Sequence, residues 1–175
     1  MKKSFKITIA VAIFAIFSLF SCGKKDSKEI EPVATPTTEE PYEEHPIETP
    51  VATNDLHIES NDQMQYSVNE LRAPAGKITL TLKHVGKMEK TAMGHNLVIL
   101  KPGTDISDFT LKAVEAKDTD YIPASEKAKV IAHTKVIGGG ESDIIEFTID
   151  EPGTYDFICS FPGHVSMMKG KLIVE

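Results

Sequence analysis

The residues best suited to chemistry lie in one short segment near the C-terminus. Cysteine, histidine and methionine follow one another there as Cys-x4-His-x3-Met, formed by Cys159, His164 and Met168. A second histidine, His95, stands far upstream in the sequence Met-Gly-His-Asn. One thiolate, two imidazoles and one thioether are the ligands of a trigonal copper site with a long, weak axial bond. The residue types and their order therefore predict a single copper centre.

Each ligand type suits one-electron chemistry at copper. A thiolate is a strong soft donor, and imidazole is acceptable to both Cu(I) and Cu(II). The thioether is weak enough to leave the geometry between the preferences of the two ions, so little has to move when one electron arrives or leaves. Pro162 restricts the backbone between the ligands, and Gly163 permits the turn toward His164.

The segments that position these ligands are predicted to be β-strands. Hydrophobic residues alternate with polar ones at Met64 to Val68, Ile78 to Leu82 and Tyr155 to Cys159. Further β-rich runs cover 96–100, 130–137, 143–149 and 170–174, and Pro-Gly or Gly-rich turns separate them. Many short strands with such turns indicate an all-β sandwich or barrel. One segment, 105–116, has helical spacing instead, with Thr104 as its expected N-cap.

The chain divides into three parts of different composition. It has 175 residues and a net charge of −7. We expect a signal segment over 1–21, an acidic tether rich in Pro, Thr and Glu over 22–55, and a folded domain over 56–175. The net acidity argues against nucleic-acid binding, which needs clustered Lys and Arg. Only Cys22 and Cys159 are present, so neither a multi-disulfide framework nor a four-cysteine zinc site is possible.

The first 22 residues predict export and lipid attachment. Three lysines precede an apolar run that is too short to span a bilayer comfortably. The run ends in Leu-Phe-Ser-Cys22, which resembles the bacterial lipobox, where the chain is cleaved before a cysteine whose sulfur then carries lipid. We expect a palmitate-type anchor at Cys22 and a membrane-held lipoprotein on the periplasmic side or at the cell surface. An ordinary signal peptide with an incidental cysteine is the alternative.

The folded domain resembles azurin, a blue copper protein of the cupredoxin superfamily. Beyond the ligand loop, the resemblance includes Leu-Lys-His84-Val-Gly, Met-Gly-His-Asn, Asp-Tyr121-Ile, Val-Ile-Ala-His133-Thr-Lys-Val-Ile-Gly and the closing Met-Lys-Gly-Lys-Leu. It covers the chain from about Asn54 to Glu175. The resemblance implies an eight-stranded Greek-key β-sandwich with a short helical insertion. Two departures stand out: no cysteine can form the disulfide usual in azurins, and Leu97 replaces a tryptophan of the best-studied members.

The resemblance also assigns roles around the copper ion. Copper would be bound by His95, Cys159 and His164, with Met168 axial and the Gly94 backbone carbonyl approaching from the opposite side. Asn96 would tie the two ligand-bearing segments together. The amides of Asn96 and Phe161 would donate to the Cys159 sulfur, and Ser160 belongs to the same surrounding shell.

Electron exit is expected at the solvent-facing edge of His164. By the same resemblance, an apolar patch would ring this edge, and it consists of Met88, Met93, Phe161, Pro162 and Val165. Some of these side chains could instead fill the core beneath the copper end. His84 would lie near the copper, either titrating with redox state or serving only as a buried structural residue, and His133 is expected to be an exposed bystander.

These observations predict a one-electron carrier that is not an enzyme and has no small-molecule substrate. A copper oxidase or nitrite reductase would need a second, substrate-binding copper with its own histidine cluster. Redox proteins such as c-type cytochromes and terminal oxidases or reductases are the expected partners. Two alternatives remain: a copper-binding or delivery module without carrier function, and a tethered structural sandwich whose Cys and His are incidental.

Overall fold

The computed structural model describes residues 52–175. The predicted signal segment, the lipobox cysteine Cys22 and most of the predicted tether lie outside the described residues. Within the described part of the chain, no helix is long and apolar enough to cross a membrane.

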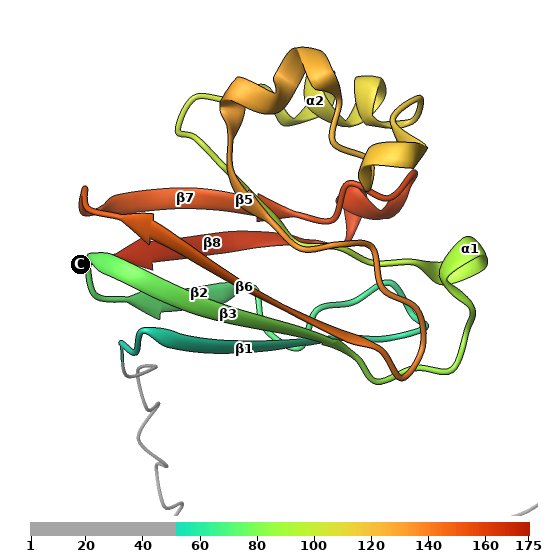
Figure 1. Cartoon of the computed structure of the whole chain (residues 1–175), viewed down its shortest axis with the longest axis horizontal. Helices are drawn as coiled ribbons and strands as arrows, with labels where there is room; N and C mark the ends of the chain where they lie inside the picture. The colour runs from blue at the N-terminus through green and yellow to red at the C-terminus, as the bar shows by residue number, and fades with distance from the viewer. Residues whose placement is uncertain (1–51) are drawn as a thin grey trace, which may run out of the picture. The chain divides into compact units, whose positions relative to one another are not determined.

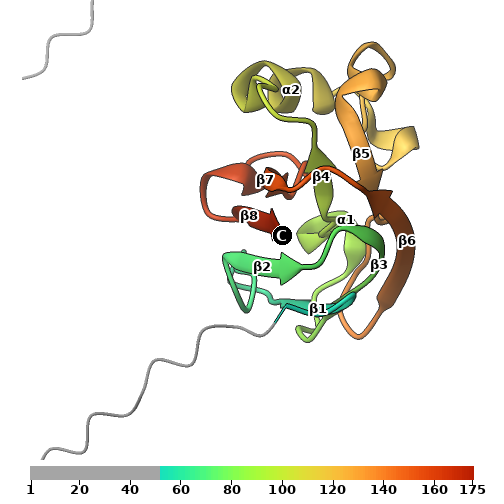
Figure 2. The same cartoon turned by 90° about the vertical axis from the view of Figure 1, so that its left-hand side faces the viewer.

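Eight strands form two sheets that pack face to face (Figures 1 and 2). One sheet has three strands in the order β1-β3-β6, and the other has five in the order β2-β8-β7-β4-β5. Strands adjacent in sequence repeatedly lie in different sheets, which confirms the predicted Greek-key sandwich. The strands are β1 (Asp55–Ser60), β2 (Glu70–Ala73), β3 (Gly76–His84), β4 (Val98–Leu100), β5 (Val130–His133), β6 (Ser142–Ile149), β7 (Gly153–Ile158) and β8 (Lys169–Val174).

Alternating hydrophobic residues place the core between the sheets. Along β3, Ile78, Leu80 and Leu82 point inward and are fully buried. They meet the inward residues of the opposite sheet, among them Phe157 on β7 and Leu172 on β8. Successive strand side chains point to opposite faces, so this period of two buries one face of each sheet.

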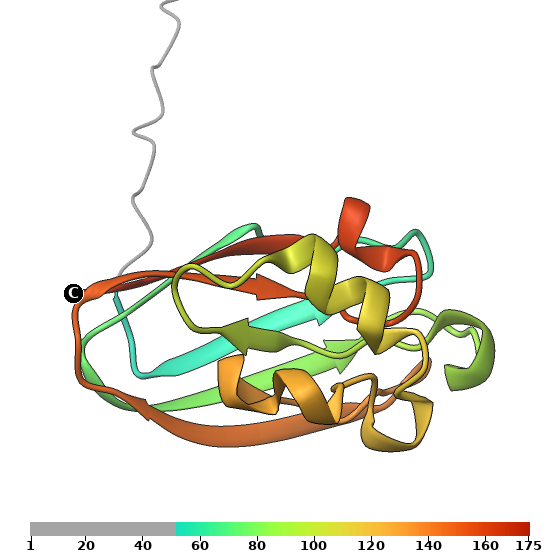
Figure 3. The same cartoon turned by 90° about the horizontal axis from the view of Figure 1, so that it is seen from above.

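A helical insertion connects β4 to β5 and lies outside the sandwich (Figure 3). It contains the helix α2 (Ile106–Ala113) and the 3-10 turns η1 (Lys117–Thr119) and η2 (Ala124–Lys129). Phe109 anchors α2 in a second core cluster. The predicted helix is confirmed, but its N-cap is Asp105 and not Thr104. The Asp105 carboxylate accepts a bond from the Asp108 amide at 3.0 Å, whereas the Thr104 hydroxyl donates to a carbonyl of the preceding turn.

One predicted strand is wrong and two strands were not predicted. The segment from Met64 to Val68 lies in a loop, with only an isolated bridge between Ser60 and Tyr66. The Asn61 side chain accepts backbone bonds from residues 63 and 65, and Met64 has a φ of 56°, so the backbone turns where alternation suggested a strand. The unpredicted strands β1 and β2 flank this loop.

The strand directions bring the chemically interesting residues to one end of the sandwich. β1 and β3 run toward this end and finish at Ser60 and His84, and β7 finishes at Ile158, directly before Cys159. The short helix α1 (Lys90–Met93) and the 3-10 turn η3 (His164–Ser166) lie at the same end, at the right of Figure 1.

Candidate metal centre

Three side chains from two distant segments converge at this end. The donor atoms of His95, Cys159 and His164 all lie within 4.8 Å of one another. The side chains are almost completely buried, with exposed fractions of 0%, 0% and 4%. His95 follows α1. Two backbone hydrogen bonds with Ile137, at 3.0 and 2.8 Å, hold it against the segment between β5 and β6. The sequence prediction that these three residues meet is therefore confirmed.

The loop from Cys159 to Met168 is closed by its own backbone. The Cys159 amide donates to the Met168 carbonyl at 2.9 Å, and the Met168 amide donates to the His164 carbonyl at 2.8 Å. Gly163 has a φ of 85°, a conformation that residues with a Cβ rarely adopt, and it turns the chain into η3. Met168 is fully buried. The loop thus fixes both ends of the Cys-x4-His-x3-Met motif.

Gly94 sits where no side chain fits. A Cβ at this position would lie 2.5 Å from the Lys90 carbonyl, 2.6 Å from Val136 and 2.9 Å from the ring of Phe161. Glycine lets the backbone preceding His95 lie close to the ligand loop.

The His95 ring is oriented by a hydrogen bond on its far side. His95 Nε2 lies 2.9 Å from the Asn61 carbonyl, which can only accept, so this nitrogen carries the proton. Its Nδ1 then presents a lone pair to His164 Nδ1 at 3.1 Å, and that nitrogen lies 3.7 Å from the Cys159 sulfur. At this distance either a proton on His164 Nδ1 or a bound cation joins the two nitrogens. Two nitrogens and one sulfur turned toward a common point fit a soft metal ion such as copper.

Burial keeps these ligands neutral without a metal. Desolvation lowers the pKa of His95 to about 4, against the hydrogen bond to Asn61, and it also lowers the pKa of His164. Desolvation raises the pKa of the Cys159 thiol to about 11, although hydrogen bonds from the backbone amides of Asn96 and Phe161 act in the opposite direction. At neutral pH the site therefore holds two uncharged imidazoles and one thiol.

The Asn96 side chain joins three segments around the site. Its oxygen accepts a bond from the Ser160 amide at 2.9 Å. Its nitrogen donates to the Asp120 carbonyl at 2.7 Å and to the Ser160 hydroxyl at 2.8 Å. Asn96 is fully buried, and its amide uses all these bonds to hold the residue after His95 against the residue after Cys159.

Sequence reasoning missed two contributors from the loop after β1. The Asn61 carbonyl orients His95, and the Tyr66 hydroxyl donates to the Asn96 carbonyl. The Tyr66 ring packs edge-on against Phe157 with ring centroids 5.7 Å apart. The position of a backbone carbonyl cannot be predicted from residue types. Tyr66 was assigned to a strand because Met64, Tyr66 and Val68 alternate with polar residues.

The two remaining histidines of the azurin-like pattern lie at different depths. His84 is fully buried, and its ring stacks on His95 with centroids 4.6 Å apart. Its Nδ1 accepts a bond from the Gly86 amide at 3.0 Å, and its Nε2 faces the Met93 carbonyl at 3.1 Å. His133 is half-buried rather than exposed, because its Nδ1 lies 3.0 Å from the Thr134 carbonyl and holds the ring against the surface.

The residues of the expected apolar patch differ in exposure. Met88 is 41% exposed, while the other four are half-buried. The Phe161 ring contacts the His164 ring, with centroids 4.7 Å apart. Val165 packs against the second core cluster, so part of this side chain fills the core beneath the ligand loop.

The protonation states predict one proton released per metal ion bound at pH 7. Metal binding requires the Cys159 thiolate, whereas both imidazoles are already neutral. The unbound site thus holds one more proton than the bound site, and affinity should rise about tenfold per pH unit between roughly pH 7 and 10, where both imidazoles are neutral and the Cys159 thiol is protonated. Calorimetric titration with redox-inert Zn²⁺ in two buffers of different ionisation enthalpy measures this number. Release of two protons, or of none, would contradict these protonation states.

Comparison with known proteins also indicates a copper-binding protein. Residues 52–175 match the sequence profile of the copper binding proteins of the plastocyanin/azurin family. The chain is 48% identical over 120 residues to Azurin-2 of Alcaligenes xylosoxydans xylosoxydans, covering 66% of this chain and 92% of that protein. It is 43% identical over 121 residues to Outer membrane protein H.8 of Neisseria gonorrhoeae, covering 66% of this chain and 64% of that protein.

Solved structures show the same fold. A dithionite-reduced auracyanin from Roseiflexus castenholzii superposes with a TM-score of 0.63 at 35% identity, over 71% of this chain and 99% of that chain. An azurin from Methylomonas sp. strain J also gives a TM-score of 0.63 at 35% identity, over 69% and 97% of the two chains. With its buried cluster of two histidines and one cysteine, the chain belongs to the plastocyanin/azurin family and is a type 1 copper electron-transfer protein.

Proposed function

We propose that His95, Cys159 and His164 bind copper in one plane, with the Met168 thioether and the Gly94 carbonyl on the two axial sides. The convergence of the three donor atoms carries this proposal. Complete burial of Met168 within the ligand loop supports its axial assignment, and the position of Gly94 directly before His95 places its carbonyl next to a ligand in the chain. Copper, when bound, supplies a one-electron couple. The protein's part is to fix the ligands, so that neither oxidation state requires the loop to rearrange.

Electrons would enter and leave through the edge of His164. This ring is the ligand with measurable exposure, at 4%, and its Phe161 neighbour is half-buried at the surface. We assign the surrounding apolar patch to brief docking of redox proteins: Met88, Met93, Phe161, Pro162 and Val165. Apolar contact with few ion pairs permits rapid separation after electron transfer, as small redox interfaces require.

The proposed setting is a membrane surface outside the cytoplasm. The lipobox-like sequence at Cys22 supports export and lipid attachment, and residues 22–55 would tether the domain of residues 56–175. The similarity to a protein named Outer membrane protein H.8 agrees with this setting.

Redox proteins such as c-type cytochromes and terminal oxidases or reductases are the partners that we propose. A copper-delivery function is not favoured, because the ligands are buried and the loop is closed by its own hydrogen bonds.

Replacing Met168 with leucine tests the axial assignment. The variant should still bind copper and remain blue, because the three planar ligands are unchanged. Its reduction potential should rise, since a weak donor to Cu(II) is lost. If the thioether favours Cu(II) over Cu(I) about tenfold, the rise is about 59 mV. Direct electrochemistry of the full chain measures the change, and an unchanged or lower potential would rule out Met168 as the axial ligand.

Replacing Met88 with glutamate tests the docking patch. A charge beside His164 should slow electron exchange between two copies about tenfold or more, because like charges meet and must be desolvated at the contact. Line broadening in mixtures of Cu(I) and Cu(II) protein measures the exchange rate. Ile144→Glu is the matched control, because Ile144 lies on β6 and is 62% exposed. Equal slowing in both variants would place the exit elsewhere.

Replacing Cys22 with serine tests the anchor. In a bacterial host fed with radiolabelled palmitate, the unaltered chain should become labelled and the Cys22→Ser chain should not, because serine has no sulfur to lipidate. Ser21→Ala is the neighbouring control and should keep the label. Labelling of the Cys22→Ser chain, or none in any chain, would remove the lipoprotein assignment and leave an ordinary signal peptide.

A further inference from the structure

We propose that a pocket beside the metal centre receives a side-chain carboxylate of an acidic redox partner, held between Lys90 and Lys117. This inference rests on the proposed exit at His164 and adds the chemistry by which a partner is chosen. The pocket has a volume of about 240 Å³. Its lining residues are Lys90, Thr91, Lys117, Asp120, Tyr121, Val136 and Phe161.

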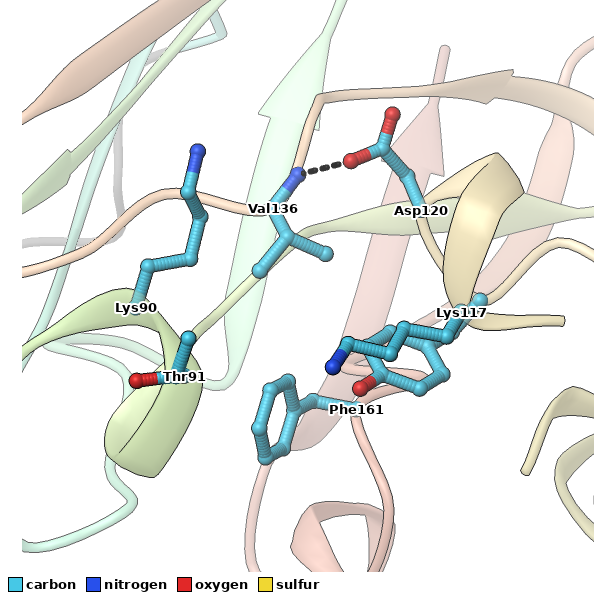
Figure 4. A pocket seen from close by; sticks show the side chains of 7 residues that line it. Lys90, Thr91, Lys117, Asp120, Val136 and Phe161 are labelled. Atoms are coloured by element: carbon cyan, nitrogen blue, oxygen red, sulfur yellow. Dashed lines mark hydrogen bonds between the residues drawn. The ribbon is translucent and has the colours of Figure 1, made fainter. Parts of the chain in front are cut away.

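Two cationic side chains stand on different sides of this pocket. Figure 4 shows Lys90 and Thr91 from α1 on one side and Lys117 from η1 on the other. Phe161 and Tyr121 supply an aromatic floor, with ring centroids 5.0 Å apart in an edge-on contact. The lining therefore combines aromatic rings with two cations and one carboxylate, which suits a carboxylate on an aliphatic stem.

The positive charges are only partly neutralised within the protein. Lys90 has its carboxylate partner, Glu141, at the long distance of 4.0 Å. Among residues 52–175, Lys117 has no carboxylate within the 4.0 Å of an ion pair. Asp120 is the acidic lining residue, and its Oδ1 already accepts a bond from the Val136 amide at 2.8 Å (Figure 4). The lining thus carries two ammonium groups against one carboxylate, so its net charge is positive and the ammonium groups can bind an external anion.

The walls of the pocket are joined to the ligand loop. Phe161 contacts both Tyr121 and the copper-ligand candidate His164. The Asp120 carbonyl is held by Asn96, the same side chain that binds Ser160. A carboxylate seated in the pocket would bring its own protein against the His164 edge on a rigid base. Binding there would therefore fix the orientation in which electrons are exchanged.

The charge of the whole domain makes this local site selective. Residues 56–175 carry 13 Lys or Arg against 17 Asp or Glu, so their net charge is negative. An acidic partner is repelled by most of such a surface and attracted where the lysines project. Opposing fields of this kind select an orientation and a class of partner more than they raise affinity.

The test is a titration with an acidic peptide. Acetylated hexaglutamate is added to the full-length Cu(I) protein in neutral detergent at low salt, and amide chemical shifts are followed. Shifts should cluster at Thr91, Lys117 and Tyr121, and hexaglutamine should produce none. Lys90→Gln/Lys117→Gln should weaken hexaglutamate binding about fivefold, since an exposed ion pair contributes little and two are removed.

A matched pair of lysines at the other end of the sandwich provides the control. Lys77 begins β3 and Lys101 follows β4, so both lie away from the metal end. Lys77→Gln/Lys101→Gln removes the same charge and should change binding less than twofold. Equal weakening by both pairs, or shifts clustered elsewhere, would overturn the proposal. The titration measures peptide binding and not electron exchange. A negative titration with slowed exchange in Met88→Glu would remove the carboxylate pocket but keep the exit at His164. A positive titration with unchanged exchange in Met88→Glu would remove the exit but keep the pocket.

Discussion

One buried amide side chain supports the metal centre. Asn96 binds the Ser160 amide and hydroxyl on the cysteine loop and the Asp120 carbonyl on the insertion. Each bond contributes about 1 kcal/mol, but a buried partner left unsatisfied costs more. Since Asn96 follows His95 and Ser160 follows Cys159, this amide fixes the separation of two ligands that lie 64 residues apart in sequence.

The ligands of the centre are uncharged before a metal binds. Burial raises the pKa of the Cys159 thiol to about 11 and lowers that of His95 to about 4, so the protein keeps its ligands uncharged. Two imidazole nitrogens face each other at 3.1 Å, an arrangement that a cation stabilises. The sandwich maintains this arrangement because the core beneath it is large and the loop closes on itself. Metal binding to these preformed ligands then adds favourable free energy to the folded state.

The sequence predicts the ligands better than their surroundings. Cys159, His164 and His95 could be named because their types and spacing suit one chemistry, and their convergence follows from the β-sandwich. The loop after β1 was misread as a strand, because Met64, Tyr66 and Val68 alternate by chance with polar residues. Its turn depends on the Asn61 side chain. The contacts of Asn61 and Tyr66 with the centre involve backbone carbonyls, which only the folded chain brings into place.

Two histidines and one cysteine are expected to hold a single copper ion in a trigonal arrangement. Visible absorption and EPR spectra of the full chain loaded with Cu(II) test this arrangement, with Cys159→Ser as the comparison. A trigonal copper–thiolate site should give an intense blue thiolate-to-copper band with narrow copper hyperfine splitting, both lost in Cys159→Ser while the fold is retained. A colourless protein, or a pale one with ordinary tetragonal copper, would contradict it.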